Sequence, residues 1–439
     1  MSMKQILTGV AGLAVIAAVG AGALLWQKHS TTRNGVADDS VALADFQSTD
    51  AEAIKRGEYV MRSADCAACH TRESGDFAGG YEIATPFGTL ISSNISPDRE
   101  TGIGAMTQRD FFDAVRNGQG SKGLLYPAMP YTAYAKISDQ DMQDLWAYMS
   151  TVKPVSHAID ENAGMGFPYN QRLAMAGWNM LFFDNSGFEA HASADPVVER
   201  GRYLVEGAGH CSACHTPRNG LGAEIGAQYL QGARIGSWFA PEITGNAHVG
   251  LGESSIEEVA TYLRSGTDGK AMASGPMAEA VEHSLQYMTQ DDARAMATYL
   301  KSLPGSELTA PQPIPATDPA MTRGALAYEV NCSACHGVAG EGMGLLAPAF
   351  AGNHAVLSDN VTNLAHVMLK GARAASSHDA PTGGGMPSFD WKMNDRQIAD
   401  VLDYIRNSWG NSAHPVNEGD ITALRTSLDA REKLPTLAP

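Results

Sequence analysis

The chain is organised around one five-residue stretch, Cys66-Ala67-Ala68-Cys69-His70. The same pattern returns twice, as Cys211-Ser212-Ala213-Cys214-His215 and as Cys332-Ser333-Ala334-Cys335-His336. The pattern C-x-x-C-H is the attachment signal for a c-type haem. Its two thiols lie one helical turn apart and add to the two haem vinyl groups, and the histidine that follows is placed to bind the iron. The three copies therefore predict three covalently bound haems c.

The competing interpretations of a C-x-x-C pair are a zinc site and thiol redox chemistry. The three motifs use all six cysteines of the chain, and a histidine closes each motif. No cysteine remains for a disulfide or a reactive thiol, so we favour haem at all three motifs. The predicted thioether bonds are made by Cys66, Cys69, Cys211, Cys214, Cys332 and Cys335. The predicted proximal iron ligands are His70, His215 and His336.

Length and composition describe a large folded protein. The 439 residues are enough for roughly three domains of ~150 residues each. A hydrophobic content of 44% with 18% charged residues is typical of a folded chain rather than a disordered one. The formal net charge of −17 argues against nucleic acid and anionic lipid headgroups as partners.

An uncharged apolar run at residues 6–26 lies between Lys4 and Lys28. Its length matches the ~20 residues that a helix needs to cross a bilayer. A cleaved signal peptide is the alternative, because Ala21-Gly22-Ala23 resembles a cleavage site. Cleavage there would leave Leu24-Leu25-Trp26 as an exposed apolar end, so we favour a retained single N-terminal anchor. Because haem c attachment is completed outside the cytoplasm, we expect the haem domains on the periplasmic side of the cytoplasmic (inner) membrane of a bacterium.

The region around each haem motif follows one plan. A helix-like stretch with Arg-Gly precedes each motif, at Arg56-Gly57, Arg200-Gly201 and Arg323-Gly324. A glycine-rich region follows, and then a helix with a capping signature that begins at Ser138, Thr289 or Asn394. Glycine inside a helix costs ~1 kcal/mol relative to alanine, and close approach of the second helix explains it. This plan resembles the class I cytochrome c fold, in which the first and last helices cross at a glycine.

We therefore predict an all-α protein of three tandem class I cytochrome c domains with an N-terminal transmembrane helix. The predicted segments are a signal-anchor helix at 1–30, a polar tether at 31–50, cytochrome c domains at 51–153, 197–303 and 320–410, a connector at 154–196, a Pro-rich linker at 304–319 and a polar C-terminal tail at 411–439. The connector contains an apolar patch at residues 173–183. We expect this patch to pack between haem domains, and a surface for a partner or for the membrane interface is the alternative.

The sixth iron ligand decides what each haem does, because a closed Met/His pair favours electron transfer and an open position permits chemistry on a bound ligand. Met129 and Met386 each stand before a proline, on a short loop that ends at the cap of the last helix. They are the predicted sixth ligands of the first and third haems. In the second domain we favour Met277, on a loop that we expect to be three or four residues longer because Met277 lies twelve residues before Thr289. His283 would instead give a bis-His haem. We expect Met288, which abuts the cap, to pack against the helix.

Several longer stretches resemble one family more closely. They include Ala84-Thr85-Pro86-Phe87-Gly88, Leu125-Tyr126-Pro127-Ala128-Met129-Pro130-Tyr131, Ile235-Gly236-Ser237-Trp238 and Gly275-Pro276-Met277-Ala278-Glu279-Ala280. Over residues 51–410 the chain resembles the triheme cytochrome c subunit of membrane-bound periplasmic dehydrogenases, which serves alcohol, aldehyde, gluconate, fructose or sorbitol dehydrogenases. Class I cytochromes c also imply that the Pro348 carbonyl accepts the Nδ1–H of His336, whereas the other two domains lack a proline at that spacing.

The resemblance implies an electron relay rather than an enzyme in its own right. A separate catalytic subunit with a quinone, flavin or molybdopterin cofactor would oxidise the substrate, and the haems would pass the electrons to ubiquinone in the membrane. The implied partners are this catalytic subunit, a further small subunit and ubiquinone. Several relatives hold the membrane through an apolar C-terminal segment, whereas residues 411–439 are polar and charged here. The N-terminal run is expected to replace that anchor.

Two other functions remain open at this point. A peroxidase-like haem enzyme needs an iron with an open or displaceable sixth position, and the second haem is the candidate. A free-standing, membrane-anchored carrier that feeds an oxidase is the other alternative.

Overall fold

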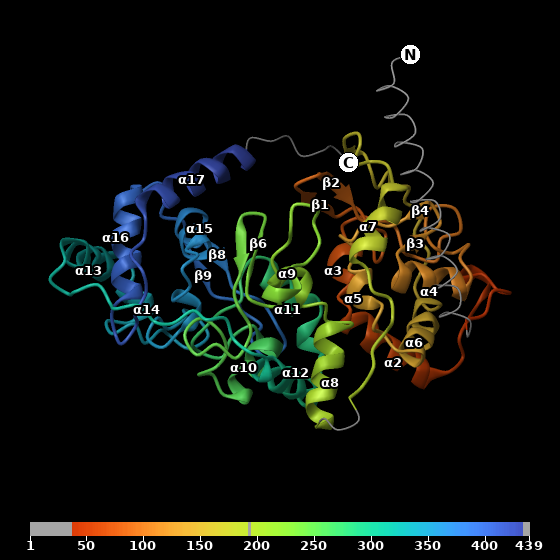
Figure 1. Cartoon of the computed structure of the whole chain (residues 1–439), viewed down its shortest axis with the longest axis horizontal. Helices are drawn as coiled ribbons and strands as arrows, with labels where there is room; N and C mark the ends of the chain where they lie inside the picture. The colour runs from red at the N-terminus through yellow and green to blue at the C-terminus, as the bar shows by residue number, and fades with distance from the viewer. Residues whose placement is uncertain (1–36, 192–194, 433–439) are drawn as a thin grey trace, which may run out of the picture. The chain divides into compact units, whose positions relative to one another are not determined.

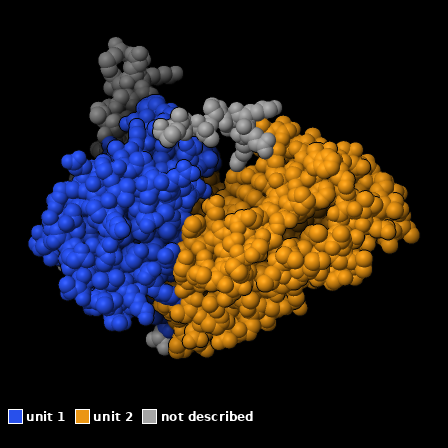
Figure 2. All heavy atoms as spheres, turned by 180° about the vertical axis from the view of Figure 1, so that it is seen from behind, with its two compact units in different colours: residues 1–192, 206–210 blue, residues 193–205, 211–439 orange. Residues whose placement is uncertain are grey.

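The structure is a computed structural model and describes residues 37–191 and 195–432 (Figure 1). These residues form two compact units, shown in blue and orange in Figure 2. Unit 1 holds the described residues up to 191 together with Glu206–His210, and unit 2 holds the rest. The first C-x-x-C-H motif lies in unit 1, and the second and third lie in unit 2. The predicted boundaries of the haem domains and of the segments between them stay predictions.

Unit 1 begins with a 3₁₀ turn followed by two helices. In chain order its elements are η1 (Leu43–Asp45), α2 (Ala51–Ser63), α3 (Cys66–His70), β1 (Glu82–Thr85), β2 (Gly88–Ile91), α4 (Gln108–Asn117), β3 (Gln119–Gly120), β4 (Gly123–Leu124), α5 (Tyr131–Tyr134), α6 (Asp139–Met149), β5 (Gly164–Met165) and α7 (Ala174–Phe182).

Unit 2 contains the second and third copies of the same plan. Its elements are α8 (Pro196–Glu206, whose last residue belongs to unit 1), α9 (Ser212–His215), η2 (Gly226–Gln228), β6 (Ala233–Ile235), β7 (Trp238–Ala240), α10 (Ile256–Ser265), α11 (Pro276–His283), η3 (Leu285–Tyr287), α12 (Gln290–Ser302), α13 (Pro319–Asn331), α14 (Ser333–His336), η4 (His354–Val356), α15 (Thr362–Lys370), β8 (Ala372–Arg373), β9 (Gly385–Met386), α16 (Asp395–Arg406) and α17 (Glu418–Glu432).

The first and last helices of each copy cross at the predicted glycine. A Cβ added at Gly57 would overlap the carbonyl oxygen of Asp144, which lies on α6. The same overlap occurs between Gly201 and Ala295 of α12, and between Gly324 and Asp400 of α16. The close approach predicted from the three Arg-Gly pairs is therefore confirmed, since only a residue without a side chain fits at each crossing.

The arginine before each glycine also binds the last helix. Arg56 donates through Nε and Nη2 to Asp144, at 2.7 and 2.9 Å. The corresponding pairs are Arg200 with Asp292 and Arg323 with Asp400, again with two hydrogen bonds each. Two parallel N–H···O bonds fix direction as well as distance. Each crossing is thus locked both by contact and by a fork-shaped ion pair.

The last helices begin where the capping signatures predicted. The side chains of Ser138, Thr289 and Asn394 each accept a hydrogen bond from the backbone N–H three residues on. In the third copy Gln397 returns the bond to the backbone of Asn394 and completes a capping box. The apolar side of α6 is fully covered, with Met142 at 0% and Leu145 at 3% exposure.

The predicted all-α class is wrong, because short antiparallel hairpins stand between the helices. The strands form a three-stranded sheet in the order β1-β2-β5 and three two-stranded pairs, β3-β4, β6-β7 and β8-β9. In β1-β2, Glu82 pairs with Ile91 and Thr85 with Gly88, around a turn at Pro86-Phe87. In β6-β7, Ile235 pairs with Trp238 around Gly236, whose φ is +57°. Strands of two to four residues are too short to show the alternation of apolar and polar residues that indicates a strand in a sequence.

The predicted N-terminal transmembrane helix also has to be corrected. Across residues 37–191 and 195–432, no helix combines the length and the apolar character needed to cross a membrane. The run at residues 6–26 lies outside the described residues. The fold class that the described residues support is a set of helical cytochrome c domains with small hairpins, and a membrane-spanning helix is not part of it.

Within unit 2 the second and third copies share a contact between β7 and α15. The backbone of Phe239 exchanges two hydrogen bonds with the side-chain amide of Asn363, at 2.8 and 2.7 Å. Beside them the ring of Trp238 stacks on His366 with centroids 4.0 Å apart. This ring contact and the pair of hydrogen bonds join the two copies within one compact unit.

Because the two helices touch at Gly57, adding a single methyl group at this position should change the stability of unit 1 strongly. Gly57→Ala should lower the stability of unit 1 by about 3 kcal/mol, the upper part of the usual range for overpacking, because the new Cβ meets backbone rather than a flexible side chain. Thermal unfolding of the haem-loaded protein measures the effect. Gly177→Ala in α7 is the matched control, since a Cβ there has nothing within 4 Å and alanine favours the helix. Equal shifts of the thermal unfolding transition in both variants would contradict the close helix contact at Gly57.

Candidate haem sites

Each C-x-x-C-H motif folds as one short helical turn that follows directly on the first helix. The first motif is the whole of α3, and the other two supply α9 and α14. In the first two copies the residue before the motif takes a left-handed backbone conformation, with φ of 52° at Asp65 and 36° at His210. This reversal lies between the first helix and the motif, so the two cysteines and the histidine stand on a separate short element.

The three histidines are oriented by the same hydrogen bond. The Nδ1 atoms lie 2.7 Å from the carbonyl oxygen of Ser93 for His70, 2.7 Å from that of Pro241 for His215, and 2.9 Å from that of Pro348 for His336. A carbonyl oxygen only accepts, so Nδ1 carries the proton and Nε2 keeps its lone pair for a metal. Burial lowers the pKa of all three imidazoles, which favours this neutral form.

Two of these three carbonyl acceptors could not be found in the sequence. The bond to Pro348, implied by the resemblance to class I cytochromes c, is present. Ser93 and Pro241 stand 23 and 26 residues after their histidines, about twice the spacing of 12 in the third copy. Each follows the second strand of a hairpin, β2 or β7. The hairpins that the sequence did not predict therefore bring the acceptor to the histidine.

The cysteines fit haem attachment better than the thiolate chemistry of a zinc or redox site. Burial raises the pKa of Cys66 and Cys211 to about 12 and that of Cys332 to about 11, so these thiols lack the lowered pKa of a redox-active C-x-x-C pair. No disulfide joins any of the six cysteines. Within the ranges that the structure describes, no three His, Cys, Asp or Glu side chains gather as a metal-binding group. One histidine with its Nε2 lone pair available, beside two thiols outside any disulfide, is the donor set of a c-type haem.

The methionines predicted for the first and third haems lie in the same cores as the corresponding motifs. Met129 and Cys66 both pack against the buried cluster around Met61 and Leu145 in unit 1. Met386 lies on β9 and packs against the cluster that contains Cys332 in unit 2. The folding of the chain thus brings together residues that are far apart in sequence. The assignment of both methionines as iron ligands stays a prediction.

The second site differs from the other two. Met277 lies in the first turn of α11 rather than on a loop, and it packs against a small cluster that includes Ala273 and Val281. His283 ends the same helix. Six helical positions separate the two residues, so their side chains leave α11 in different directions. Met288 is buried at 4% exposure, as expected for a packing residue.

The connector, whose apolar patch was expected to pack between haem domains, packs against the loop that carries Met129. Arg172 donates to the Leu124 carbonyl at 3.0 Å, and Tyr126 donates its hydroxyl to the Tyr169 carbonyl at 2.8 Å. The outer side of the connector is exposed and apolar. Its exposed residues are Phe167, Tyr169, Leu173, Met180 and Leu181. The apolar patch at residues 173–183 is therefore buried on one side only.

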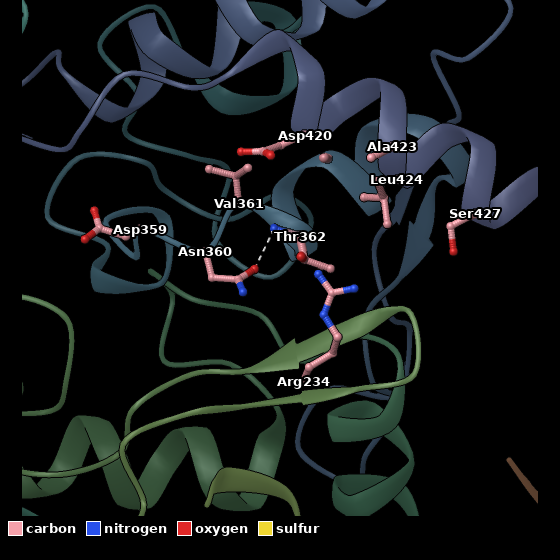
Figure 3. A pocket seen from close by; sticks show the side chains of 10 residues that line it. Arg234, Asp359, Asn360, Val361, Thr362, Asp420, Ala423, Leu424 and Ser427 are labelled. Carbon is pink, nitrogen blue, oxygen red and sulfur yellow. Dashed lines mark hydrogen bonds between the residues drawn. The ribbon is translucent and has the colours of Figure 1, made fainter. Parts of the chain in front are cut away.

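A cavity of about 290 Å³ lies in unit 2 between β6, α15 and α17 (Figure 3). Arg234 points into it from β6, below Thr362 and Leu424 (Figure 3). None of the cysteines, histidines or methionines predicted to hold a haem lines this cavity. Val361, Ala365 and Leu424 connect its wall to the core that contains Cys332. The cavity is therefore separate from the candidate haem sites.

Comparison with known proteins agrees with this geometry. The family model "Cytochrome c" matches residues 198–304 and 321–409. A second family model, "Cytochrome C oxidase, cbb3-type, subunit III", matches residues 52–149. The three matched segments each contain one C-x-x-C-H motif.

Several characterised relatives are similar along most of their length. The gluconate 2-dehydrogenase cytochrome c subunit of Pantoea cypripedii is 42% identical over 88% of this chain and 92% of its own. The cytochrome c subunit of the alcohol dehydrogenase (quinone) of Gluconobacter oxydans is 40% identical over 88% and 85%. The fructose dehydrogenase cytochrome subunit of Gluconobacter japonicus is 37% identical over 85% and 82%. The chain therefore belongs to the family of cytochrome c subunits of dehydrogenases, and it is an electron-transfer subunit rather than a catalytic one.

Proposed function

We propose that this chain carries three covalent haems c and relays electrons from a separate catalytic dehydrogenase subunit to ubiquinone. The observation that carries the proposal is the threefold repetition of one arrangement. In each copy, a C-x-x-C-H turn follows a helix that is locked to the last helix, and the histidine Nδ1 is committed to a backbone carbonyl. A single enzyme site would not need this arrangement three times in one chain.

Bound haem iron supplies reversible one-electron chemistry between its ferrous and ferric states. The residues of the chain determine how this chemistry is used. The cysteine pairs hold the group covalently, and the carbonyl acceptors orient His70, His215 and His336. A methionine as the sixth ligand and an apolar surrounding both raise the reduction potential. Met129 and Met386 stand in such apolar cores. These features support electron transfer over chemistry on a bound ligand.

The names of the relatives support a catalytic dehydrogenase as the partner. The similar proteins are cytochrome subunits of gluconate, alcohol and fructose dehydrogenases. Their cytochrome subunits are alike while the named substrates differ. Substrate specificity therefore belongs to the partner subunit, and this chain supplies the route for electrons that such partners share.

The proposed location is the periplasmic side of the inner membrane. Haem c attachment is completed outside the cytoplasm, so a chain with three attachment motifs has to be exported. Ubiquinone is dissolved in the membrane, and a periplasmic subunit of a dehydrogenase complex lies next to it. A formal net charge of −17 is compatible with a protein partner and unfavourable for direct binding to anionic lipid headgroups.

The relay is tested on the protein purified from membranes under native conditions. We expect three haems per polypeptide by haem quantification and by mass, and two in the double variant Cys332→Ala/Cys335→Ala. A larger dehydrogenase subunit should copurify, and its substrate should reduce the haems before a ubiquinone analogue is reduced. Two haems in the unaltered chain, or a haem that stays high-spin and binds carbon monoxide, would overturn the relay of three closed haems.

The sixth ligands are tested one at a time by spectroscopy. Met129→Leu, Met277→Leu and Met386→Leu should each remove one of three contributions to the weak red absorption band of Met-ligated ferric haem, and each should lower one midpoint potential. Met288→Leu and Met393→Leu are matched controls, because both residues are buried methionines that are not predicted to bind iron. An unchanged band in Met277→Leu would exclude Met277. A conversion of one haem to high spin in His283→Leu, with the band unchanged, would indicate His283.

A further inference from the structure

One side-chain amide in the connector is buried without a complete set of partners. Asn179 lies on α7 and is 1% exposed. Its Oδ1 accepts the hydroxyl proton of Tyr131 at 2.7 Å. Its Nδ2 has no hydrogen-bond partner among the described atoms. An unsatisfied buried N–H group is costly, so it indicates an acceptor that the protein atoms do not supply.

Through Tyr131, the Oδ1 atom of Asn179 contacts the loop that carries Met129. Tyr131 stands two residues after Met129, is fully buried, and donates its backbone N–H to the Met129 carbonyl at 2.7 Å. The phenol ring is held from two sides. Phe183 meets it edge-on with centroids 5.1 Å apart, and a Cβ at Gly118 would come within 2.9 Å of it. With its ring confined and its hydroxyl bound, Tyr131 keeps the Met129 backbone in one place.

The unpaired side of Asn179 needs an acceptor in the same region. A c-type haem brings two carboxylates, and these are the strongest acceptors that the group at the first site would contribute. A hydrogen bond to an ionised acceptor is shorter and stronger than one between neutral groups. A buried neutral amide is suited to this role, because it stabilises the carboxylate without adding a second charge to the core.

We propose that Asn179 is a positioning residue for the first haem, holding the Met129 loop through Tyr131 with its Oδ1 and donating its Nδ2–H to a haem carboxylate. The proposal rests on Met129 as the sixth ligand under the proposed function. The two sides of the amide then have separate effects. The Oδ1 side restrains the ligand loop, and the Nδ2 side reduces the negative potential that the carboxylate exerts at the iron. The connector is therefore part of the first haem site.

The Nδ2 side is tested by spectroelectrochemistry of the full haem-loaded protein. Met129→Leu first identifies which of the redox transitions belongs to the first haem. Asn179→Leu should shift the redox equilibrium of that transition about tenfold toward the oxidised form, which is about 59 mV for one electron, and should leave the other transitions in place. If the leucine variant does not fold, Asn179→Ala makes the same test without overpacking.

The Oδ1 side is tested with Tyr131→Phe, which removes only the hydroxyl. This variant should speed the displacement of Met129 by added imidazole at the first haem and should leave the midpoint potentials unchanged. The control is Asn246→Leu in unit 2, which removes a similarly buried amide whose hydrogen bonds go to Ser306 and Leu308. It should lower stability and shift no transition of the first haem.

Two outcomes distinguish an error in this inference from an error in the proposed function on which it rests. If Asn179→Leu lowers thermal stability without moving the first transition, the amide is only a packing residue and the inference is overturned. If Met129→Leu displaces no transition, the assignment of Met129 under the proposed function is wrong.

Discussion

Close contact between two helix backbones is the constraint on which each of the three C-x-x-C-H units depends. Gly57, Gly201 and Gly324 allow the first helix of a unit to touch a carbonyl of the last helix, where any side chain would collide. The arginine before each glycine then binds an aspartate on the last helix with two hydrogen bonds. The crossing fixes the end of the first helix, and the C-x-x-C-H turn starts from that end. A shift at the crossing would move both cysteines and the histidine together.

The orientation of each histidine depends on one further contact besides the helix crossing. The helices alone leave each imidazole free to rotate, and a backbone carbonyl removes that freedom by accepting the Nδ1 proton. In the first two units the carbonyl arrives on a hairpin, and in the third unit it comes from a loop at Pro348. Three different local structures therefore give one chemical result. The shared requirement is an acceptor at the right place, whichever element supplies it.

The connector contacts the loop that carries Met129. Residues of the predicted segment 154–196 form hydrogen bonds with Leu124, Tyr126 and Tyr131 around this loop. The opposite side of the same segment has exposed apolar side chains. One short segment therefore restrains the Met129 loop on one side and presents apolar surface on the other.

The sequence by itself determined the features that depend on neighbours in the chain. The three C-x-x-C-H motifs, the Arg-Gly positions and the helix caps at Ser138, Thr289 and Asn394 are short patterns with a direct chemical meaning, and the structure contains the crossings and caps that they predicted. Family resemblance added the relay, and the similar cytochrome subunits agree with it.

Only the tertiary structure decided the contacts that join distant segments. The hairpins are too short to leave a periodic signal, so neither Ser93 nor Pro241 could be recognised as the partner of a histidine. In the sequence, Asn179 is a single polar residue within an apolar run. Only the structure shows that its side chain accepts a hydrogen bond from Tyr131, 48 residues earlier. Met277 was expected on a loop and lies in a helix instead, because the chain there begins a helix at Pro276. Spacing along a chain measures contour length, whereas these contacts depend on where the turns bring the backbone.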